Sequence, residues 1–334
     1  MSKGYGYVVW GVGGLYRVRL LPARAKAVPK PYEDQPLDGV TVFARGRGNL
    51  RRGEGLLVGD FVEVSYDERS FTSRNGTVIP AEDGAGIVIS GVLPRRCALI
   101  RPPMANLDVL FVTAAAASPA PDYGTLDKLL CIAVHNGILP VVVVNKRDLA
   151  PEKANEMEAI YRGAGFLTFS TVGKTGEGIA ALSEWIARNL PGKLAAFAGA
   201  SGVGKSTLLG KLFPGVSFQT GDISRRISRG KNTTRQIEIH PLSEDPDCGY
   251  IADTPGFTML DFEQFDFFDL ADLPATFPEF APYLGKCRYT DCTHTKEEDC
   301  EIVRAVKAGK IAPSRHETYL ALYQTLKKKP KWKS

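Results

Sequence analysis

Two loop motifs constrain the fold of this chain more than any other feature of its sequence. The first, NKRD at residues 145–148, directly follows a run of four valines. The second, GASGVGKS at residues 199–206, begins more than fifty residues later. Both end compact apolar runs, which helix-like segments such as TLDKLLCIAVHNG separate from one another. Apolar strands that alternate with helices predict an α/β fold with a parallel sheet covered on both faces. Ligands of such sheets bind beyond the carboxyl ends of the strands, where both motifs lie.

Residues 199–206 fit the phosphate-loop pattern G-x-x-x-x-G-K-[ST], between a predicted strand at residues 194–198 and a predicted helix. Gly202 and Gly204 let the backbone curl so that its N–H groups point at phosphate oxygens, and the helix N-terminus adds its positive dipole end. We expect Lys205 to contact the β- and γ-phosphates and Ser206 to bind Mg²⁺. The predicted nucleotide contacts of this loop are Gly199, Ala200, Ser201, Gly202, Val203, Gly204, Lys205, Ser206 and Thr207.

The NKRD motif is predicted to select the base. The Asp148 carboxylate can accept hydrogen bonds from the N1–H and N2 amino groups of guanine, whereas adenine would leave it unpaired, which is costly. The stem of Lys146 can lie over the purine, and Asn145 can tie this loop to the phosphate loop. The backbone of residues 170–172 suits a contact with guanine O6. The predicted base-binding residues are Asn145, Lys146, Arg147, Asp148, Ser170, Thr171 and Val172.

The segment DTPG at residues 253–256 and a pair of threonines complete the predicted site. Asp253 would hold Mg²⁺ through water, and the Gly256 N–H would meet the γ-phosphate. The threonines could reach Mg²⁺ when GTP is bound, although they also suit a solvated loop. Phe257 occupies the position where many GTPases carry a glutamine that orients the attacking water, so unaided hydrolysis should be slow. The residues predicted to act in catalysis are Lys205, Ser206, Thr233, Thr234, Asp253 and Gly256.

The order of these motifs is unusual. The base loop precedes the phosphate loop, and DTPG comes last, whereas in an ordinary GTPase the phosphate loop comes first. Such an order results when a sheet is cut open and rejoined elsewhere, which a parallel sheet tolerates if its old termini lie close together. DTPG, which senses the γ-phosphate, then leads directly into the C-terminal region. A short covalent path could therefore transmit the nucleotide state to that region.

The C-terminal region contains the segment KCRYTDCTHTKEEDC. Its three thiolates and one imidazole satisfy tetrahedral Zn²⁺ and leave no position open, as in a structural site. Because the region is too small for a large core, a metal would help to stabilise it. The predicted zinc ligands are Cys287, Cys292, His294 and Cys300, and the scattered cysteines expected in the core are Cys97, Cys131 and Cys248.

The first 95 residues contain short alternating runs separated by Gly and Pro turns, among them GYVVW, LYRVRL and DFVEVSY. Such a series of short strands suggests a small barrel, and an OB-fold, which often binds oligonucleotides, is the first candidate. Arg45, Arg47, Arg51 and Arg52 suit a nucleic-acid face, but they also suit a structural barrel with solubilising arginines. We therefore predict three domains, at residues 1–95, 96–265 and 266–334.

The formal net charge is +5, and basic residues gather at residues 225–235 and 327–333. Clustered basic charge attracts phosphate backbones, although a solvated surface and a frayed tail would give the same pattern. No apolar run approaches the ~20 residues of a membrane span, and the N-terminus lacks a secretory pattern. We therefore expect a cytoplasmic protein without a membrane partner, in which disulfides would be rare. We also expect a monomer.

The segment at residues 92–115, NKRD, GASGVGKST, the threonine pair, DTPGF and the cysteine segment together resemble one family: the circularly permuted ribosome small-subunit-dependent GTPase A of bacteria. The resemblance covers most of the chain. It implies an N-terminal OB-fold, a permuted GTPase domain and a C-terminal zinc domain, with Mg²⁺ bound beside GTP. It further implies hydrolysis of GTP to GDP, stimulation by the small ribosomal subunit and its rRNA, and a late step in assembly of that subunit. Asn232 departs from the family, which has a histidine proposed to position water there.

Two other interpretations remain open. A permuted GTPase of the large ribosomal subunit would share the motif order, but it is not expected to carry the barrel or the zinc cluster. An RNA-binding clamp that senses nucleotide, with only incidental turnover, is partly supported by Phe257.

Overall fold

The computed structural model describes residues 2–48, 50, 55–74, 77–80, 86–218, 237–254 and 267–329. The chain divides into two compact units, each assembled from separate stretches of sequence. The first comprises residues 1–108, 186–196 and 215–256, and the second comprises residues 109–185, 197–214 and 257–334. Asp253 therefore belongs to the first unit, whereas the base loop and the phosphate loop belong to the second.

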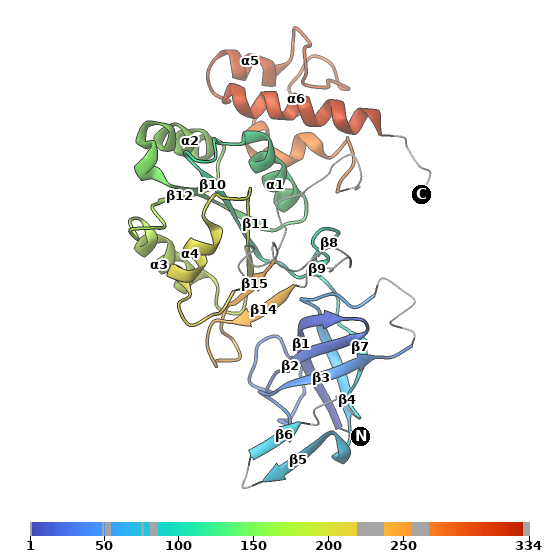
Figure 1. The fold of residues 1–334 in the computed structure, drawn as a ribbon. Coiled ribbons are helices and arrows are strands. Elements are labelled where there is room, and N and C mark those ends of the chain that lie inside the picture. The colour runs from blue at the N-terminus through green and yellow to red at the C-terminus, as the bar shows by residue number, and fades with distance from the viewer. Residues whose placement is uncertain are drawn as a thin grey trace, which may run out of the picture. The chain divides into compact units, whose positions relative to one another are not determined.

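The N-terminal part of the first unit is a small β-barrel (Figure 1). Its strands are β1 (Ser2–Val12), β2 (Leu15–Leu20), β3 (Thr41–Gly46), β4 (Phe61–Tyr66) and β7 (Val88–Val92). β1 pairs antiparallel with both β2 and β4, and a parallel pairing of β3 with β7 closes the barrel. Alternate residues such as Val18, Val42 and Val62 fill the interior, because successive side chains of a strand point to opposite faces. The predicted OB-fold is confirmed.

Shorter elements extend the first unit. The 3₁₀ turn η1 (Glu68–Ser70) leads into the hairpin of β5 (Phe71–Arg74) and β6 (Thr77–Pro80), and β8 (Ala98–Leu99) pairs with β9 (Met104–Ala105). β14 (Glu238–Pro241) pairs antiparallel with β15 (Tyr250–Asp253), which runs parallel to the first residues of β13 (Leu194–Ala198).

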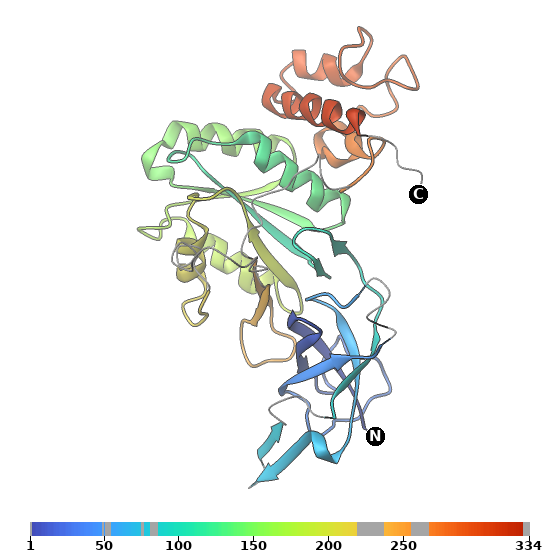
Figure 2. The same cartoon turned by 45° about the vertical axis from the view of Figure 1, so that its right-hand side comes forward.

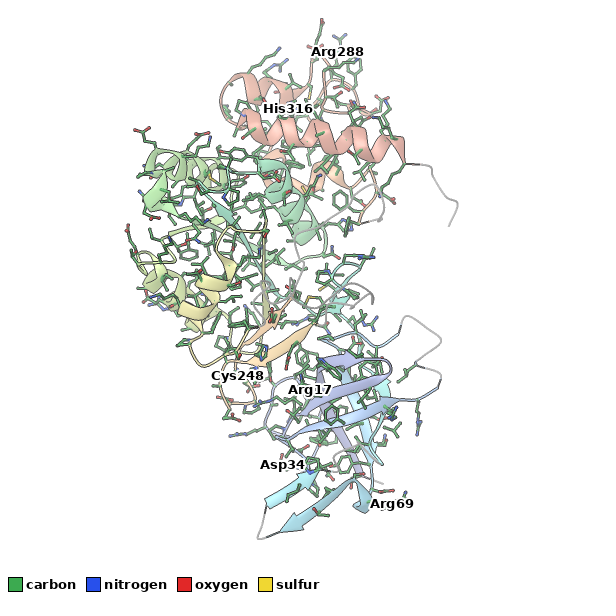
Figure 3. The ribbon with its side chains drawn as sticks, in the orientation of Figure 1. Arg17, Asp34, Arg69, Cys248, Arg288 and His316 are labelled. Carbon is green, nitrogen blue, oxygen red and sulfur yellow. The ribbon has the colours of Figure 1, made fainter. Side chains whose placement is uncertain are left out.

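The barrel is attached to the hairpin of β14 and β15. Trp10 of β1 pairs with Glu238 of β14. Arg17 of β2, which is labelled in Figure 3, forms an ion pair with Glu238, and its guanidinium carbon lies 5.3 Å from the centre of the Trp10 ring. The barrel and this hairpin therefore form one continuous sheet within the first unit.

In the second unit, the strands β10 (Val109–Ala115), β11 (Leu139–Asn145) and β12 (Leu167–Thr171) run parallel. Every residue of β10 is buried, as expected for a parallel strand with both faces covered. Helices α1 (Tyr123–His135), α2 (Pro151–Gly163) and α4 (Lys205–Leu212) belong to this unit, whereas α3 (Ile179–Asn189) begins in it and ends in the first unit. The apolar runs of the sequence thus form the strands, and the segments between them form the helices.

The C-terminal region comprises η4 (Leu273–Thr276), η5 (Pro278–Phe280), α5 (Glu301–Lys307) and α6 (Pro313–Lys328). Figures 1 and 2 show α6 beside α1, and the two helices are in contact. The rings of Phe277, Phe280 and Tyr319 pack together with centroids 5.0–5.4 Å apart. Within the described residues, no helix combines the length and the apolar character needed to cross a membrane.

Candidate functional site

The phosphate loop connects the end of β13 to α4. Gly199 has a φ of 140°, and a Cβ atom there would lie 2.0 Å from the carbonyl oxygen of Thr113 in β10, so a larger residue would displace the strand. Gly202 and Gly204 have φ angles of 80° and 101°, which glycine adopts without steric cost. The glycine pattern of the sequence therefore follows from the backbone geometry of this turn.

Lys205 begins α4 and turns its ammonium group back into the loop. Its Nζ donates hydrogen bonds to the carbonyl oxygens of Gly199 at 2.7 Å and Ala200 at 2.8 Å. Burial lowers the pKa of Lys205 to about 8. An anionic group nearby would favour the charged lysine again, so this loop suits a negatively charged ligand. Ser206 and Thr207 are exposed in the same first helical turn.

Asn145 connects the base loop to two other loops from the end of β11. Its side chain is buried, and its Nδ2 donates to the carbonyl oxygen of Val203 at 2.8 Å. Its Oδ1 accepts hydrogen bonds from the Gly173 N–H at 2.9 Å and from the Thr171 hydroxyl at 3.2 Å. A single amide therefore holds the base loop, the phosphate loop and the loop after β12 together.

Lys146 makes a second connection to the phosphate loop. Its φ of 61° lies in the left-handed region. Its Nζ donates hydrogen bonds to the carbonyl oxygens of Gly202, at 2.7 Å, and of Ser118, in the loop between β10 and α1. Three loops that follow different strands consequently meet at this ammonium group.

Arg147 and Asp148 point in different directions. The Arg147 guanidinium turns toward α2, where it lies 2.8 Å from both Glu158 and Asn155, and it also approaches the Ser170 hydroxyl at 3.4 Å. Asp148 lies in η2 (Arg147–Leu149) and is exposed. The Asp148 carboxylate is thus accessible to a ligand, whereas Arg147 braces the loop against its neighbours.

The segment predicted to contact guanine O6 lies at the end of β12. Thr171 and Val172 are buried, and Ser170 is half-buried. The Val172 N–H already donates to the carbonyl oxygen of Glu177 at 2.9 Å. A contact with the base would therefore need another group of this segment.

A small pocket lies beside the phosphate loop. Part of its lining comes from Asp122, the N-cap residue of α1, and from Leu126 and Leu129 of that helix. Ala200 and Val203 of the phosphate loop form another part. Helix α1 is consequently one wall of the region around the phosphate loop.

Asp253 ends β15 in the first unit and is buried. Arg45 and Arg47, predicted to face nucleic acid, are exposed at the end of β3. Several predicted residues lie outside the described residues: Arg51, Arg52, the basic cluster at 225–235, Asn232, Thr233, Thr234, Gly256 and Phe257.

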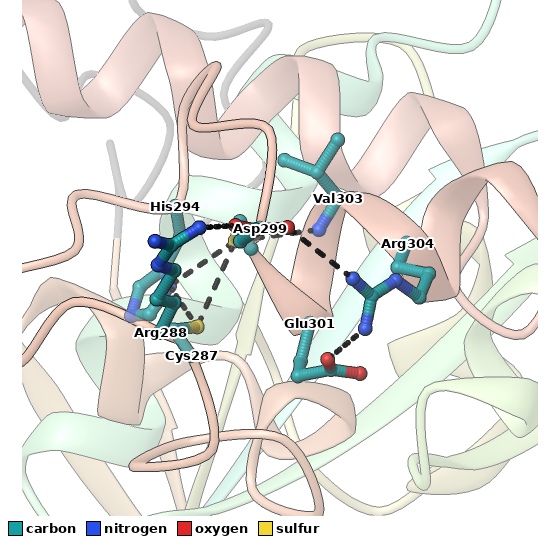
Figure 4. A network of polar contacts seen from close by, with 8 residues as sticks. Cys287, Arg288, His294, Asp299, Glu301, Val303 and Arg304 are labelled. Carbon is teal, nitrogen blue, oxygen red and sulfur yellow. Dashed lines mark hydrogen bonds and ion pairs between the residues drawn. The ribbon is translucent and has the colours of Figure 1, made fainter.

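The C-terminal cysteines and histidine converge as their spacing predicted, and Figure 4 shows Cys287 and His294 of this cluster. One ligand atom from each of Cys287, Cys292, His294 and Cys300 lies within 4.8 Å of the others. His294 Nδ1 is 3.6 Å from the sulfurs of Cys287 and Cys300, which are 3.9 Å apart. These four donors could hold a metal ion. Of the other cysteines, Cys131 and Cys248 are buried as expected, whereas Cys97 is only partly buried.

The sequence did not reveal the side chains that shape the loop around this cluster. Glu297 accepts a hydrogen bond from the Thr293 N–H at 2.9 Å. From α6, the Tyr319 hydroxyl donates to the Thr293 carbonyl oxygen, and His316 Nε2 lies within hydrogen-bond distance of the His294 carbonyl oxygen, both at 2.8 Å. The residues of these two hydrogen bonds are 26 and 22 positions apart in the sequence, so the spacing of the cysteines could not predict the contacts.

This chain is similar to known proteins in both sequence and fold. The family model described as RsgA GTPase matches residues 92–263. The chain belongs to the RsgA GTPase family. A "small ribosomal subunit biogenesis GTPase RsgA" from Agathobacter rectalis is 35% identical over 329 residues, which cover 98% of this chain and 99% of that protein. The protein of the same name from Moorella thermoacetica is 39% identical over 284 residues, covering 85% and 89% of the two chains.

Solved structures agree with the RsgA assignment. YjeQ from Thermotoga maritima has a TM-score of 0.74 and 29% identity, covering 98% of this chain and 100% of that chain. YloQ, described as a circularly permuted GTPase, has a TM-score of 0.67 and 25% identity, covering 99% and 98%. The permuted GTPase fold expected from the motif order is therefore confirmed.

Proposed function

We propose that this chain hydrolyses GTP and acts in the biogenesis of the small ribosomal subunit, late in its maturation. The observation that carries the proposal is the Asn145 amide, which joins the base loop to a phosphate loop that comes later in the chain. This connection joins loops at the carboxyl ends of the parallel strands, where ligands of such sheets bind, and so supports a guanine-nucleotide site there. The names of the RsgA relatives supply the small subunit as the target.

The roles of the site residues follow from their placement. The exposed Asp148 carboxylate would bind the guanine edge, and Lys205 would pair with the β- and γ-phosphates. Ser206 and Asp253 would hold Mg²⁺, which offsets phosphate charge when bound. Thr233, Thr234 and Gly256 would respond to the γ-phosphate. Phe257 cannot hydrogen-bond to the attacking water, so turnover should be slow until a partner assists.

We further propose that the metal of the C-terminal cluster is zinc. Bond lengths of tetrahedral zinc place two thiolate sulfurs about 3.8 Å apart and a sulfur about 3.5 Å from an imidazole nitrogen. The separations of 3.9 Å and 3.6 Å among Cys287, His294 and Cys300 fit both values, and the donor atoms of all four residues lie within 4.8 Å of one another. Three thiolates and one imidazole would fill the coordination shell, so the ion would be structural and would take no part in hydrolysis.

Each of three parts of the chain would have its own role. Residues 1–95 would bind RNA, residues 96–265 would bind and hydrolyse GTP, and residues 266–334 would bind zinc and present basic side chains. Arg45 and Arg47 support an RNA-binding role for the barrel because both are exposed. A monomer that acts on small subunits in the cytoplasm fits this division.

The test is GTP turnover by the purified full chain, alone and with isolated small or large ribosomal subunits. We expect slow turnover alone, strong stimulation by small subunits only, and none in the control Lys205→Ala. Stimulation by large subunits alone would support a large-subunit GTPase instead. Nucleotide-dependent RNA binding without stimulation by either subunit would support a clamp and contradict the proposal.

A further inference from the structure

An arginine of the C-terminal region lies in the interior of the second unit. Arg315 of α6 is 1% exposed. Its Nη1 lies 2.6 Å from Oδ1 of Asp127 in α1, and its Nε lies 2.6 Å from Oε1 of Glu279 in η5. The carboxylates are themselves buried, with side chains 0% and 4% exposed. One guanidinium therefore joins α6 to a helix of the GTPase sheet.

Aromatic rings enclose this ionic group. The guanidinium carbon lies 4.6 Å from the centre of the Phe277 ring and 5.3 Å from that of Phe166. The Tyr161 hydroxyl donates to Asp127 Oδ1 at 2.9 Å. Although burial alone would lower the pKa of Arg315, the two carboxylates raise it above its ordinary value, so the group stays charged. A buried ion pair adds little net stability, because removing its charges from water costs about as much as their attraction returns.

Helix α1, which Arg315 contacts through Asp127, also borders the nucleotide site. Leu126 and Leu129, which flank Asp127 in α1, line the pocket beside the phosphate loop. Asp122 caps the same helix, and the loop before it bonds to Lys146 through the Ser118 carbonyl oxygen. A shift of α1 would therefore disturb both the phosphate loop and the base loop.

We propose that Arg315 is a positioning residue: it clamps α1 to the metal-binding C-terminal region and so couples the occupancy of the nucleotide site to that region. This coupling is distinct from the covalent path through DTPG, and its relevance to turnover rests on the proposed function. Coupling between sites is reciprocal. Nucleotide binding should therefore stabilise α6 by the same free energy by which a ligand of the C-terminal region changes nucleotide affinity.

The first test needs no ribosome. Hydrogen exchange is measured along the full chain with and without GDP. In the wild type, GDP should slow exchange in both α1 and α6, by about fivefold in α6. Arg315→Met alone would leave the buried carboxylates of Asp127 and Glu279 without their cationic partner, and the protein would then be at risk of unfolding for that reason alone. The informative variant therefore combines Arg315→Met, Asp127→Asn and Glu279→Gln, which leaves a neutral core.

The triple variant should keep a melting temperature close to that of the wild type and should bind GDP with an affinity within about threefold. GDP should then slow exchange in α1 but no longer in α6. Arg304→Met is the matched control, because Arg304 lies on neighbouring α5 with a side chain that is 59% exposed, and it should behave as the wild type. Arg315→Lys, which keeps one charge, should retain part of the effect on α6.

Turnover gives a second, separate readout. If small subunits stimulate the wild type, stimulation of the triple variant should fall by roughly tenfold, with its turnover alone little changed. Absence of stimulation in the wild type would contradict the proposed function but not the proposed role of Arg315. Equal slowing of α6 by GDP in the wild type and the triple variant, or no slowing in the wild type, would overturn the clamp.

Discussion

Replacing Asn145 with alanine should separate the loops of the nucleotide site. The side chain is 2% exposed, and its three hydrogen bonds contribute about 1 kcal/mol each. The substitution also leaves the Val203 carbonyl oxygen and the Gly173 N–H without this partner. We expect the joined arrangement of the loops to lose about 3 kcal/mol relative to separated loops, or roughly 100-fold in population. Since a nucleotide must bring the loops together again, the apparent Kd for GDP should rise by up to this factor.

Calorimetric titration with GDP measures this effect, and thermal unfolding of the free variant shows whether the fold survives. Asn136→Ala is a matched control, because its Nδ2 bonds only locally to the Ile132 carbonyl oxygen, at 2.9 Å, beyond the end of α1. The control should bind GDP within about twofold of the wild type. If Asn145→Ala binds GDP as tightly as the wild type, this amide does not organise the loops, and our account of the site is wrong.

Three further outcomes are expected. Asp148→Asn turns an acceptor into a donor opposite the N–H groups of guanine, so GTP affinity should fall at least about tenfold while xanthosine triphosphate gains; unchanged GTP binding in a competition assay would refute base recognition by this loop. Burial lowers the pKa of Lys205 to about 8 from an ordinary 10.5. Between these values the free folded protein binds fewer protons than the unfolded chain, so its stability should rise with pH. GDP affinity should fall as the pH rises over the same range, because the phosphates bind the charged form of the lysine. Calorimetry in buffers of different ionisation enthalpy would detect the proton taken up on binding. If this proton uptake persists in Lys205→Arg, Lys205 is not its source. Cys292→Ser should release the metal and speed hydrogen exchange in residues 267–329 while GDP still binds, with an affinity reduced by no more than the coupling through Arg315; complete loss of GDP binding would show that the nucleotide site depends on this region to fold.

The sequence alone determined the features that depend on local backbone geometry or ligand spacing. The strand predicted at residues 194–198 is β13, because a continuous apolar run between turn residues suits a buried parallel strand. Gly199, Gly202 and Gly204 marked the phosphate loop, because the positive φ angles of this turn favour glycine at each position. The spacing of Cys287, Cys292, His294 and Cys300 predicted a metal cluster, because four donors in fourteen residues suffice to enclose one ion. The order of the motifs predicted the circular permutation.

Only the tertiary structure decided which side chains connect these local features. Arg315 meets Glu279 and Asp127, which are 36 and 188 residues away, so no local pattern marks it as a buried clamp. Arg147 looked like a nucleotide contact because it lies within NKRD, but packing turns its guanidinium toward α2. The pKa of Lys205 depends on how deeply the folded loop buries its ammonium group. Such properties arise from contacts between distant segments, and those contacts exist only once the sheet and its helices have packed.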